Sequence, residues 1–72
     1  NLISRLHARI EASKMRFVLV DQSTNGTFVH TAAGEEQFVR RDSLPISGEG
    51  LIGLGRAPER DSSQTIRFIC EE

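Results

Sequence analysis

The sequence predicts an all-β fold, and three observations carry this prediction. Apolar and polar residues alternate over several short runs, which is the pattern of strands that bury one face. Gly, Pro, Asn and Ser separate these runs and favour turns. No window of ten or more residues keeps the three-to-four spacing of apolar residues that an amphipathic helix needs.

The first two predicted strands cover residues 8–11 and 15–20, on either side of a short polar turn. In the first strand, Ala8 and Ile10 share one face and charged residues occupy the other. In the second strand, apolar side chains occupy both faces. We therefore expect the second strand to be covered on both sides.

Turn residues also divide the rest of the chain into short elements. Pro45 and two following glycines exclude a helix in the middle of this region. In the last run, Ile66, Phe68 and Cys70 are expected to share a face. The predicted elements are a hairpin of residues 27–30 and 36–40 around a turn at 31–34, a turn at 44–50, a strand at 51–54, a loop at 55–64 and a strand at 65–70.

The chain has 72 residues and four Phe but no Trp or Tyr, so it can hold one domain at most. A β-sandwich usually needs about 100 residues to close. The chain begins at Asn1 with an apolar pair directly behind it and no initiator Met. We therefore expect residues 1–72 to be part of a domain that begins upstream.

Charge and cysteine content limit the classes of ligand. The net charge of -1 gives no broad basic surface for nucleic acid, and no apolar run approaches the roughly 20 residues that span a membrane. Four basic residues near the N-terminus could bind one compact anion, although charge alone favours a solvated strand face. The single cysteine, Cys70, excludes an intrachain disulfide and favours the cytoplasm. We expect Cys70 to be a small apolar strand residue.

An enzyme is the weaker interpretation. Ser4, His7 and Asp21 are the residue types of a nucleophilic triad, but Ser4 has no neighbouring glycine to form the strained turn on which a nucleophile usually sits. His7 and His30 are the only histidines, and no carboxylate stands at a spacing that completes a metal site. We expect no catalysis, no metal and no cofactor.

Two polar segments suit a binding site better. Ser4 and Thr24 offer hydroxyls, Arg5 a fixed positive charge, and Asn25 an amide that donates and accepts. A phosphate needs several charge-assisted donors, and an extended peptide beside it needs a group that both donates and accepts. His7 lies between apolar neighbours, so we expect it to be buried and hydrogen-bonded. These groups together suit a phosphorylated peptide.

At these residues the chain resembles a forkhead-associated (FHA) domain, a phosphothreonine-recognition module. The family signatures S-R-x-H-A and D-x-S-x-N-G-T-x-V match Ser4-Arg5-Leu6-His7-Ala8 and Asp21 to Val29 in full and in order. The later element I-x-L-G matches Ile52-Gly53-Leu54-Gly55, and Leu44 to Gly50 resembles the L-x-x-G-x-G turn with one more residue before its first glycine. The resemblance runs from about residue 2 to residue 70.

The resemblance implies an FHA-like β-sandwich, of the SMAD/FHA type, whose loops at one end bind phosphothreonine. By position, Ser4, Arg5 and Thr24 would contact phosphate and Asn25 would bond the peptide main chain. His7 and Gly26 would shape the loops. Selectivity for phosphothreonine over phosphoserine would come from a small pocket for the γ-methyl group.

The chain departs from the family at its N-terminal end. FHA domains carry a Gly-Arg pair upstream of the Ser-Arg-x-His segment, and Gly55-Arg56 lies downstream instead. We therefore expect an N-terminally truncated domain, the C-terminal two-thirds, that lacks the first strands. A strand edge exposed in this way could pair with another chain, either in a strand-swapped dimer or in a complex with the missing piece of the domain.

The sequence thus predicts a non-catalytic module that binds phosphothreonine-containing proteins or peptides in signalling. The alternative is a structural or assembly role in which the same fold contacts a protein surface whatever its phosphorylation state. Nucleic acid and membrane are not expected partners.

Overall fold

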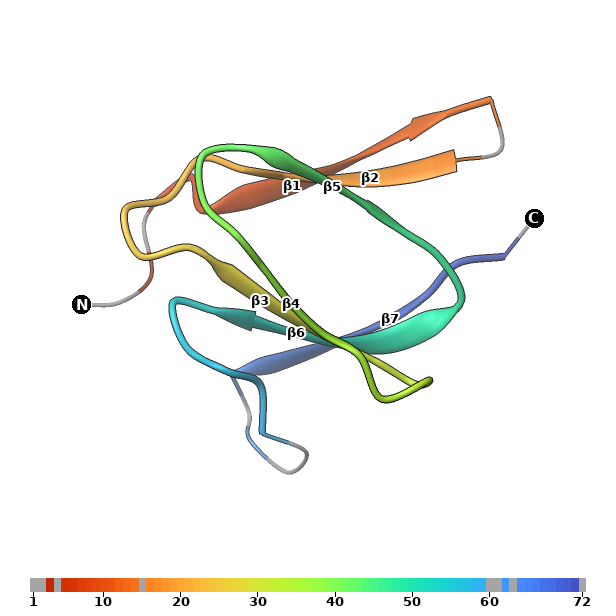
Figure 1. Ribbon diagram of the computed structural model, residues 1–72. Coiled ribbons are helices and arrows are strands. Elements are labelled where there is room, and N and C mark those ends of the chain that lie inside the picture. Colours follow the sequence, from red (N-terminus) through yellow and green to blue (C-terminus); the bar gives the residue numbers. More distant parts are fainter. Residues whose placement is uncertain (1–2, 4, 15, 60–61, 63, 72) are drawn as a thin grey trace.

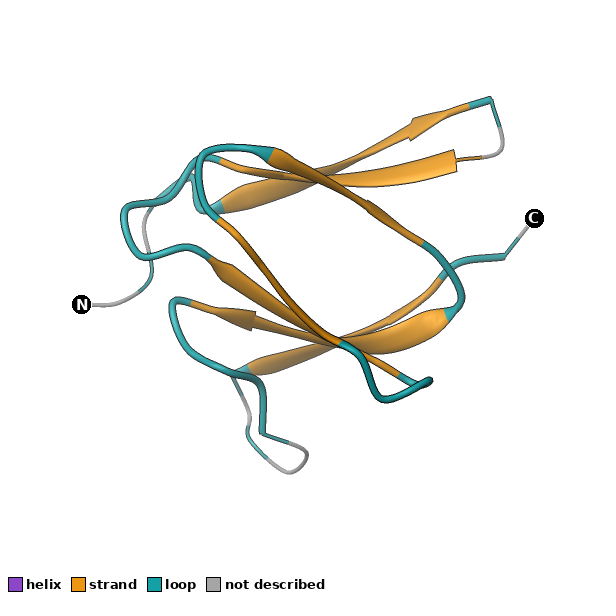
Figure 2. Ribbon diagram, in the orientation of Figure 1, coloured by secondary structure: helices purple, strands orange, loops and turns teal. Residues whose placement is uncertain are grey.

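The computed structural model describes residues 3, 5–14, 16–59, 62 and 64–71, and these form two antiparallel sheets (Figure 1). Strands, turns and loops make up the whole described part of the chain (Figure 2), which confirms the all-β prediction. Within those residues no helix is long and apolar enough to cross a membrane. The strands are β1 (Ala8–Ser13), β2 (Arg16–Asp21), β3 (Thr27–Thr31), β4 (Glu36–Val39), β5 (Ser43–Ile46), β6 (Glu49–Leu54) and β7 (Thr65–Ile69).

The two sheets have the orders β1-β2-β5 and β4-β3-β6-β7, and all their pairings are antiparallel. β2 and β3 are consecutive but belong to different sheets, so the chain crosses between the sheets through residues 22–26. The chain crosses again from β4 to β5 and from β5 to β6. These crossings make the molecule a sandwich and place residues 22–26 at one end of it.

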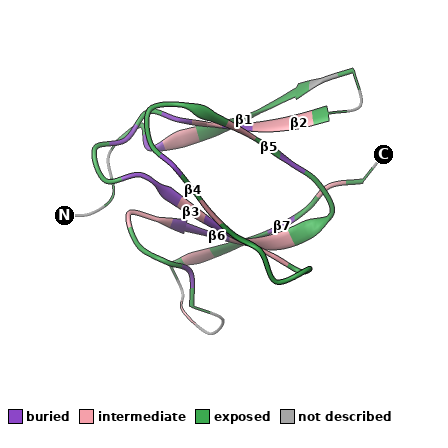
Figure 3. Ribbon diagram, viewed as in Figure 1, coloured by how far each residue is buried: buried purple, intermediate pink, exposed green. Residues whose placement is uncertain are grey.

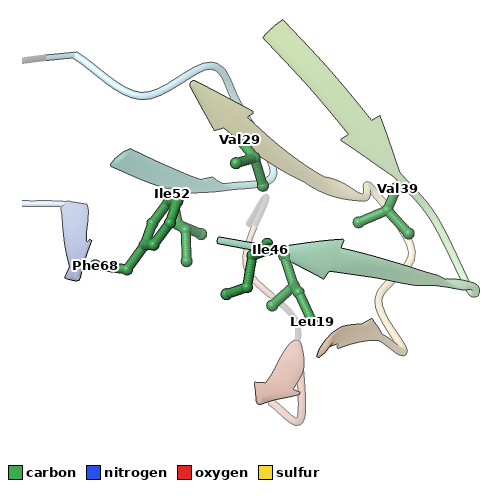
Figure 4. Close-up of a cluster of buried hydrophobic side chains, with 6 residues drawn as sticks. All are labelled: Leu19, Val29, Val39, Ile46, Ile52 and Phe68. Atoms are coloured by element: carbon green, nitrogen blue, oxygen red, sulfur yellow. The ribbon is translucent and has the colours of Figure 1, made fainter. Parts of the chain in front are cut away.

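The core lies between the two sheets and consists of aliphatic side chains and one phenylalanine. The three-stranded sheet contributes Leu19 and Ile46, and the other sheet contributes the rest. Figure 4 shows these side chains directed toward one another from both layers. Alternation along each strand explains the pattern, because every second side chain of a strand points to the same face. The full set is Leu19, Val29, Val39, Ile46, Ile52 and Phe68.

The region predicted as a turn at residues 44–50 is instead largely strand. β5 occupies Ser43–Ile46 and β6 begins at Glu49, which leaves a short connection between them. Pro45 lies opposite Val18 in the β2–β5 pair. A proline is tolerated there because β5 is an edge strand, so the N–H that proline lacks is not needed by a second neighbour.

The covering of the strands differs from the prediction in two places. Val18 and Val20 are only partly buried, so β2 is not enclosed on both faces. In the last strand, Phe68 is buried as expected, whereas Ile66 is 47% exposed. Ile66 lies opposite the core residue Ile52 and therefore faces inward, yet about half of its surface is accessible. β7 has more exposed than buried positions (Figure 3).

Gly53 allows the β6–β7 loop to fold back on its own strand. A Cβ at Gly53 would overlap the carbonyl oxygen of Arg56 and lie 2.6 Å from the nitrogen of Pro58. Pro58 is buried in this arrangement. The close approach of two backbone segments explains why glycine suits this position of the I-x-L-G element.

Candidate functional site

Four chain segments meet at the end of the sandwich that lies toward the N-terminus in Figure 1. They are residues 5–7, the β2–β3 loop, the β4–β5 loop and the start of the β6–β7 loop. Backbone hydrogen bonds join them in pairs: Gln22 N–H donates to the His7 carbonyl at 2.9 Å, and Asp21 N–H to the Asp42 carbonyl at 2.8 Å. Both polar sequence motifs lie at this end.

Asp21 organises the β2–β3 loop from a buried position, with 2% of its surface exposed. Its carboxylate accepts hydrogen bonds from Ser23 N–H at 2.9 Å and from Ser23 Oγ at 2.8 and 2.9 Å. It also accepts one from Thr27 Oγ1 at 2.5 Å and one from Arg41 N–H at 2.8 Å. The carboxylate therefore connects both ends of the loop to the neighbouring β4–β5 loop.

These contacts determine the acidity of Asp21. Burial on its own would raise the pKa of the carboxyl group, because removal from water disfavours the charged form. The hydrogen bonds from Thr27, from the Arg41 N–H and from Ser23 act in the opposite direction, and together they lower the pKa below its ordinary value. The carboxylate is thus held in its charged, accepting form.

The lowered pKa predicts that acid destabilises the domain through Asp21. A carboxyl group that is more acidic in the folded state stabilises it fully above the unfolded pKa of about 3.9, and this stabilisation is lost as the pH falls through the folded pKa. Between about pH 6 and pH 3, the free energy of unfolding in urea should fall more steeply for the parent than for Asp21→Asn. Equal slopes for the two proteins would contradict the assignment.

Gly26 closes the loop and binds it to two other segments. Its N–H donates to Ser23 Oγ at 2.7 Å, and its carbonyl oxygen accepts from His7 Nε2 at 2.7 Å and from Gly55 N–H at 2.9 Å. The backbone of Gly26 has φ +87°, in the left-handed region that favours glycine. One carbonyl group thus ties together the segment before β1, the β2–β3 loop and the β6–β7 loop.

His7 is buried, with 5% of its surface exposed, and it supports the β2–β3 loop. Since a carbonyl oxygen can only accept, the proton of the imidazole lies on Nε2. Nε2 is also 3.8 Å from Oδ1 of Asp21, so this nitrogen faces both the Gly26 carbonyl and the Asp21 carboxylate. Both sequence motifs therefore meet at this imidazole.

Arg41 is a further support that the sequence analysis did not identify. Besides the bond from its N–H to Asp21, its Nε donates to the Ser23 carbonyl at 3.2 Å. Its φ of +52° is unusual for a residue other than glycine. Arg41 thus packs the β4–β5 loop against the β2–β3 loop, a contact between segments about 20 positions apart that no local motif indicates.

Within the β2–β3 loop and at its two ends, the residues that hold its shape are buried and the candidate ligand-binding residues are exposed. Asp21, Ser23 and Thr27 have at most 2% of their surface accessible. Thr24 and Asn25, which lie between Ser23 and Thr27 in the sequence, are exposed at the tip of the loop. Arg5 is exposed two residues before His7. The alternation explains how a polar loop can hold its shape while it presents other polar groups to solvent.

The remaining sequence-predicted residues are placed as follows. Ser4 lies outside the described residues. Lys14 and Arg16 lie beyond the far end of β1, so the four basic residues near the N-terminus do not form one patch: a six-residue strand separates them by roughly 20 Å. Arg5 is the member of that group at the loop end.

The carboxylate of Asp21 is occupied by loop contacts, and no cluster of three metal-binding side chains occurs among the described residues.

The family model of the FHA domain matches residues 1–47. The chain belongs to the FHA-domain family. Searches among curated proteins and among solved structures each found no match. The matched segment ends just after β5, but β6 pairs with β3 along five residues, so the structure joins the C-terminal strands to the sandwich of the matched part. The FHA domain is a non-catalytic binding module, and the two-sheet architecture of this chain agrees with that fold.

Proposed function

We propose that this FHA domain binds phosphothreonine-containing peptides and so mediates phosphorylation-dependent protein–protein interaction in signalling. The observation that carries the proposal is the His7–Gly26 hydrogen bond of 2.7 Å, which holds the Arg5 segment against the loop that presents Thr24 and Asn25. Three exposed polar residues thereby lie on two segments fixed to one another.

The chemistry of these residues suits the two parts of such a ligand. Phosphothreonine carries a charge of about -1.5 to -2 at neutral pH and accepts hydrogen bonds strongly, which suits the guanidinium of Arg5 and the hydroxyls of Ser4 and Thr24. The Asn25 amide can donate to one main-chain group and accept from another. We assign Asn25 to the peptide backbone, and His7 and Gly26 to the structure of the loops. Cytoplasmic location is part of the proposal, and cell fractionation would test it.

Titration of a phosphothreonine peptide into the chain tests this assignment. Asn25→Ala and Arg5→Gln should each weaken binding by about 1.5–3 kcal/mol, or roughly 10- to 150-fold in Kd, because each removes a hydrogen bond to a charged or buried partner. Arg67→Gln is a matched control, because Arg67 is an exposed arginine on β7 beside the β3–β4 turn. It should bind like the parent, and equal binding by all three variants would refute the site.

The same titration distinguishes the alternative role. A phosphorylation-independent assembly module would bind the phosphothreonine peptide and its unphosphorylated form equally. A phosphoserine version of the peptide tests the expected preference for threonine. We expect the order phosphothreonine, then phosphoserine, then the unphosphorylated peptide, and the reverse order of the first and last would exclude the proposed function.

A further inference from the structure

Asn25 and Gly26 form a dipeptide that can lose ammonia without any enzyme. Glycine has no side chain to keep its main-chain nitrogen away from the amide of a preceding asparagine. Asn25-Gly26 is the only asparagine–glycine pair in the sequence, and Asn25 lies exposed at the tip of the β2–β3 loop, where water reaches it. The candidate site therefore contains a residue whose side chain can change chemically.

The reaction depends on the main-chain nitrogen of Gly26. This nitrogen attacks the side-chain carbonyl carbon of Asn25 and forms a C–N bond. The side-chain nitrogen of Asn25 leaves as ammonia, which carries the proton given up by the Gly26 N–H. Water then opens the resulting five-membered imide at either carbonyl group, which gives aspartate, or isoaspartate with one more carbon in the main chain.

In the fold, the attacking nitrogen is held by Ser23. The Gly26 N–H donates to Ser23 Oγ at 2.7 Å, and Ser23 has no exposed surface. The hydroxyl proton of Ser23 is directed to the carboxylate of Asp21, whose oxygens lie 2.8 and 2.9 Å from Oγ. The oxygen of the hydroxyl is thereby left to accept from Gly26. The proton that the reaction must remove is thus in a buried hydrogen bond.

The carbonyl group of Gly26 is fixed as well. It accepts from His7 Nε2 at 2.7 Å and from Gly55 N–H at 2.9 Å, and Gly26 itself is buried. The ring of Phe38 occupies the place that a Cβ at Gly26 would take. Both main-chain groups of Gly26 are therefore restrained by other segments, and the nitrogen reacts only after these contacts open.

We propose that Asn25 is a deamidation site that the folded loop keeps closed through the Ser23–Gly26 hydrogen bond. Each local opening of the loop releases the Gly26 N–H and exposes Asn25 to conversion, and hydrolysis of the imide makes the conversion irreversible. Asn25 thus records how often the β2–β3 loop has opened.

Conversion would also change the binding site. A carboxylate at position 25 accepts hydrogen bonds but cannot donate one, and its charge repels a phosphate. Chains converted to aspartate or isoaspartate should therefore lose the phosphothreonine peptide. This consequence rests on the proposed function, whereas the protection of Asn25 by the fold does not.

Incubation of the chain in mildly alkaline buffer tests the protection. Intact mass and peptide mapping should show loss of ammonia at Asn25 in urea, and the rate in the folded chain should be at least about tenfold lower. Asn25→Gln should lack the modification in urea over the same period, since its longer side chain forms the corresponding ring less readily. A folded chain that deamidates as fast as the unfolded chain, or faster, would overturn the proposal.

Ser23→Ala tests which contact provides the protection. It should raise the rate in the folded chain by about tenfold or more, because the Gly26 N–H loses its acceptor. Ile46→Ala is the control, since it destabilises the core from the end of β5 away from the loop. When both rates are compared with the free energy of unfolding in urea, Ser23→Ala should exceed what its loss of stability explains. A rate that follows stability equally in both variants would contradict the role of Ser23.

Hydrogen exchange in the parent provides a test without substitution. Exchange of the Gly26 amide and deamidation of Asn25 should rise together in urea below the unfolding transition. Deamidation that proceeds while the Gly26 amide stays protected would overturn the proposal. Titration of the converted chain with the phosphothreonine peptide then tests the consequence: binding equal to that of the parent would refute the role of Asn25 in binding, and not its protection by the fold.

Discussion

Asp21→Ala is expected to lower the free energy of unfolding by about 3–5 kcal/mol. The change removes the acceptor of Ser23, Thr27 and the Arg41 N–H, and Ser23 and Thr27 are fully buried, so their donors would lose their partners away from water. Each unsatisfied buried donor costs about 1–3 kcal/mol. Urea unfolding of the parent and the variant measures the difference.

A neighbouring aspartate provides the control for this experiment. Asp42 is exposed, and its carboxylate accepts a local bond from Ser43 N–H at 2.8 Å. Asp42→Ala should therefore cost well under half as much as Asp21→Ala, since water can replace the lost acceptor. A similar loss for both variants would mean that Asp21 does not organise the loops as the geometry indicates.

Gly26→Ala is expected to lower the free energy of unfolding by about 2–4 kcal/mol, and Gly34→Ala by only about 1–2 kcal/mol. Both glycines have a left-handed backbone, with φ of +87° and +93°, so both substitutions carry the same conformational cost. At Gly26 a Cβ would in addition overlap the ring of Phe38 and lie 3.2 Å from the carbonyl oxygen of Val39. At Gly34 a Cβ would meet no atom within 4 Å.

Gly34→Ala therefore measures the cost of backbone strain alone, and Gly26→Ala measures the same strain together with crowding against Phe38. Thermal and urea unfolding should rank the parent first, then Gly34→Ala, then Gly26→Ala. Peptide binding should be weakened by Gly26→Ala alone, because its carbonyl holds the segment that carries Arg5. Equal stability of the two variants would show that the Phe38 ring moves away from the added Cβ without lowering the free energy of unfolding.

Local sequence patterns predicted most of the fold. Alternation placed β1, β3, β4 and β7 to within one or two residues at either end, because side-chain direction in a strand has a period of two. The pattern at Pro45 was misleading, since proline excludes a central strand but not an edge strand, and edge position depends on tertiary structure. The exposure of Ile66 was unpredictable for the same reason. Alternation predicts to which face of the strand a side chain points, but not which other residues cover that face.

The candidate site was only partly accessible to such reasoning. The motifs contained Asp21 and Ser23, but their local hydrogen-bonding capacity did not reveal that one carboxylate also holds Arg41 of another loop. The D-x-S-x-N-G-T spacing was the available signal, since a buried aspartate needs donors and Ser23 and Thr27 supply them nearby. Arg41 carries no such signal, because its role depends on the pairing of β5 with β2, which brings the β4–β5 loop to Asp21.

The shared carbonyl of Gly26 also has a consequence for how the site is assembled. His7 bonds to this carbonyl from 19 residues away, and Arg41 bonds to Asp21 from 20 residues away. Contacts between residues so far apart form only after the intervening chain has folded back on itself, so the loop sequence alone does not make them. A peptide corresponding to the loop alone would therefore lack its shape, and a partly folded chain would be unable to bind. Ligand binding by this domain should report on the folding of the whole sandwich.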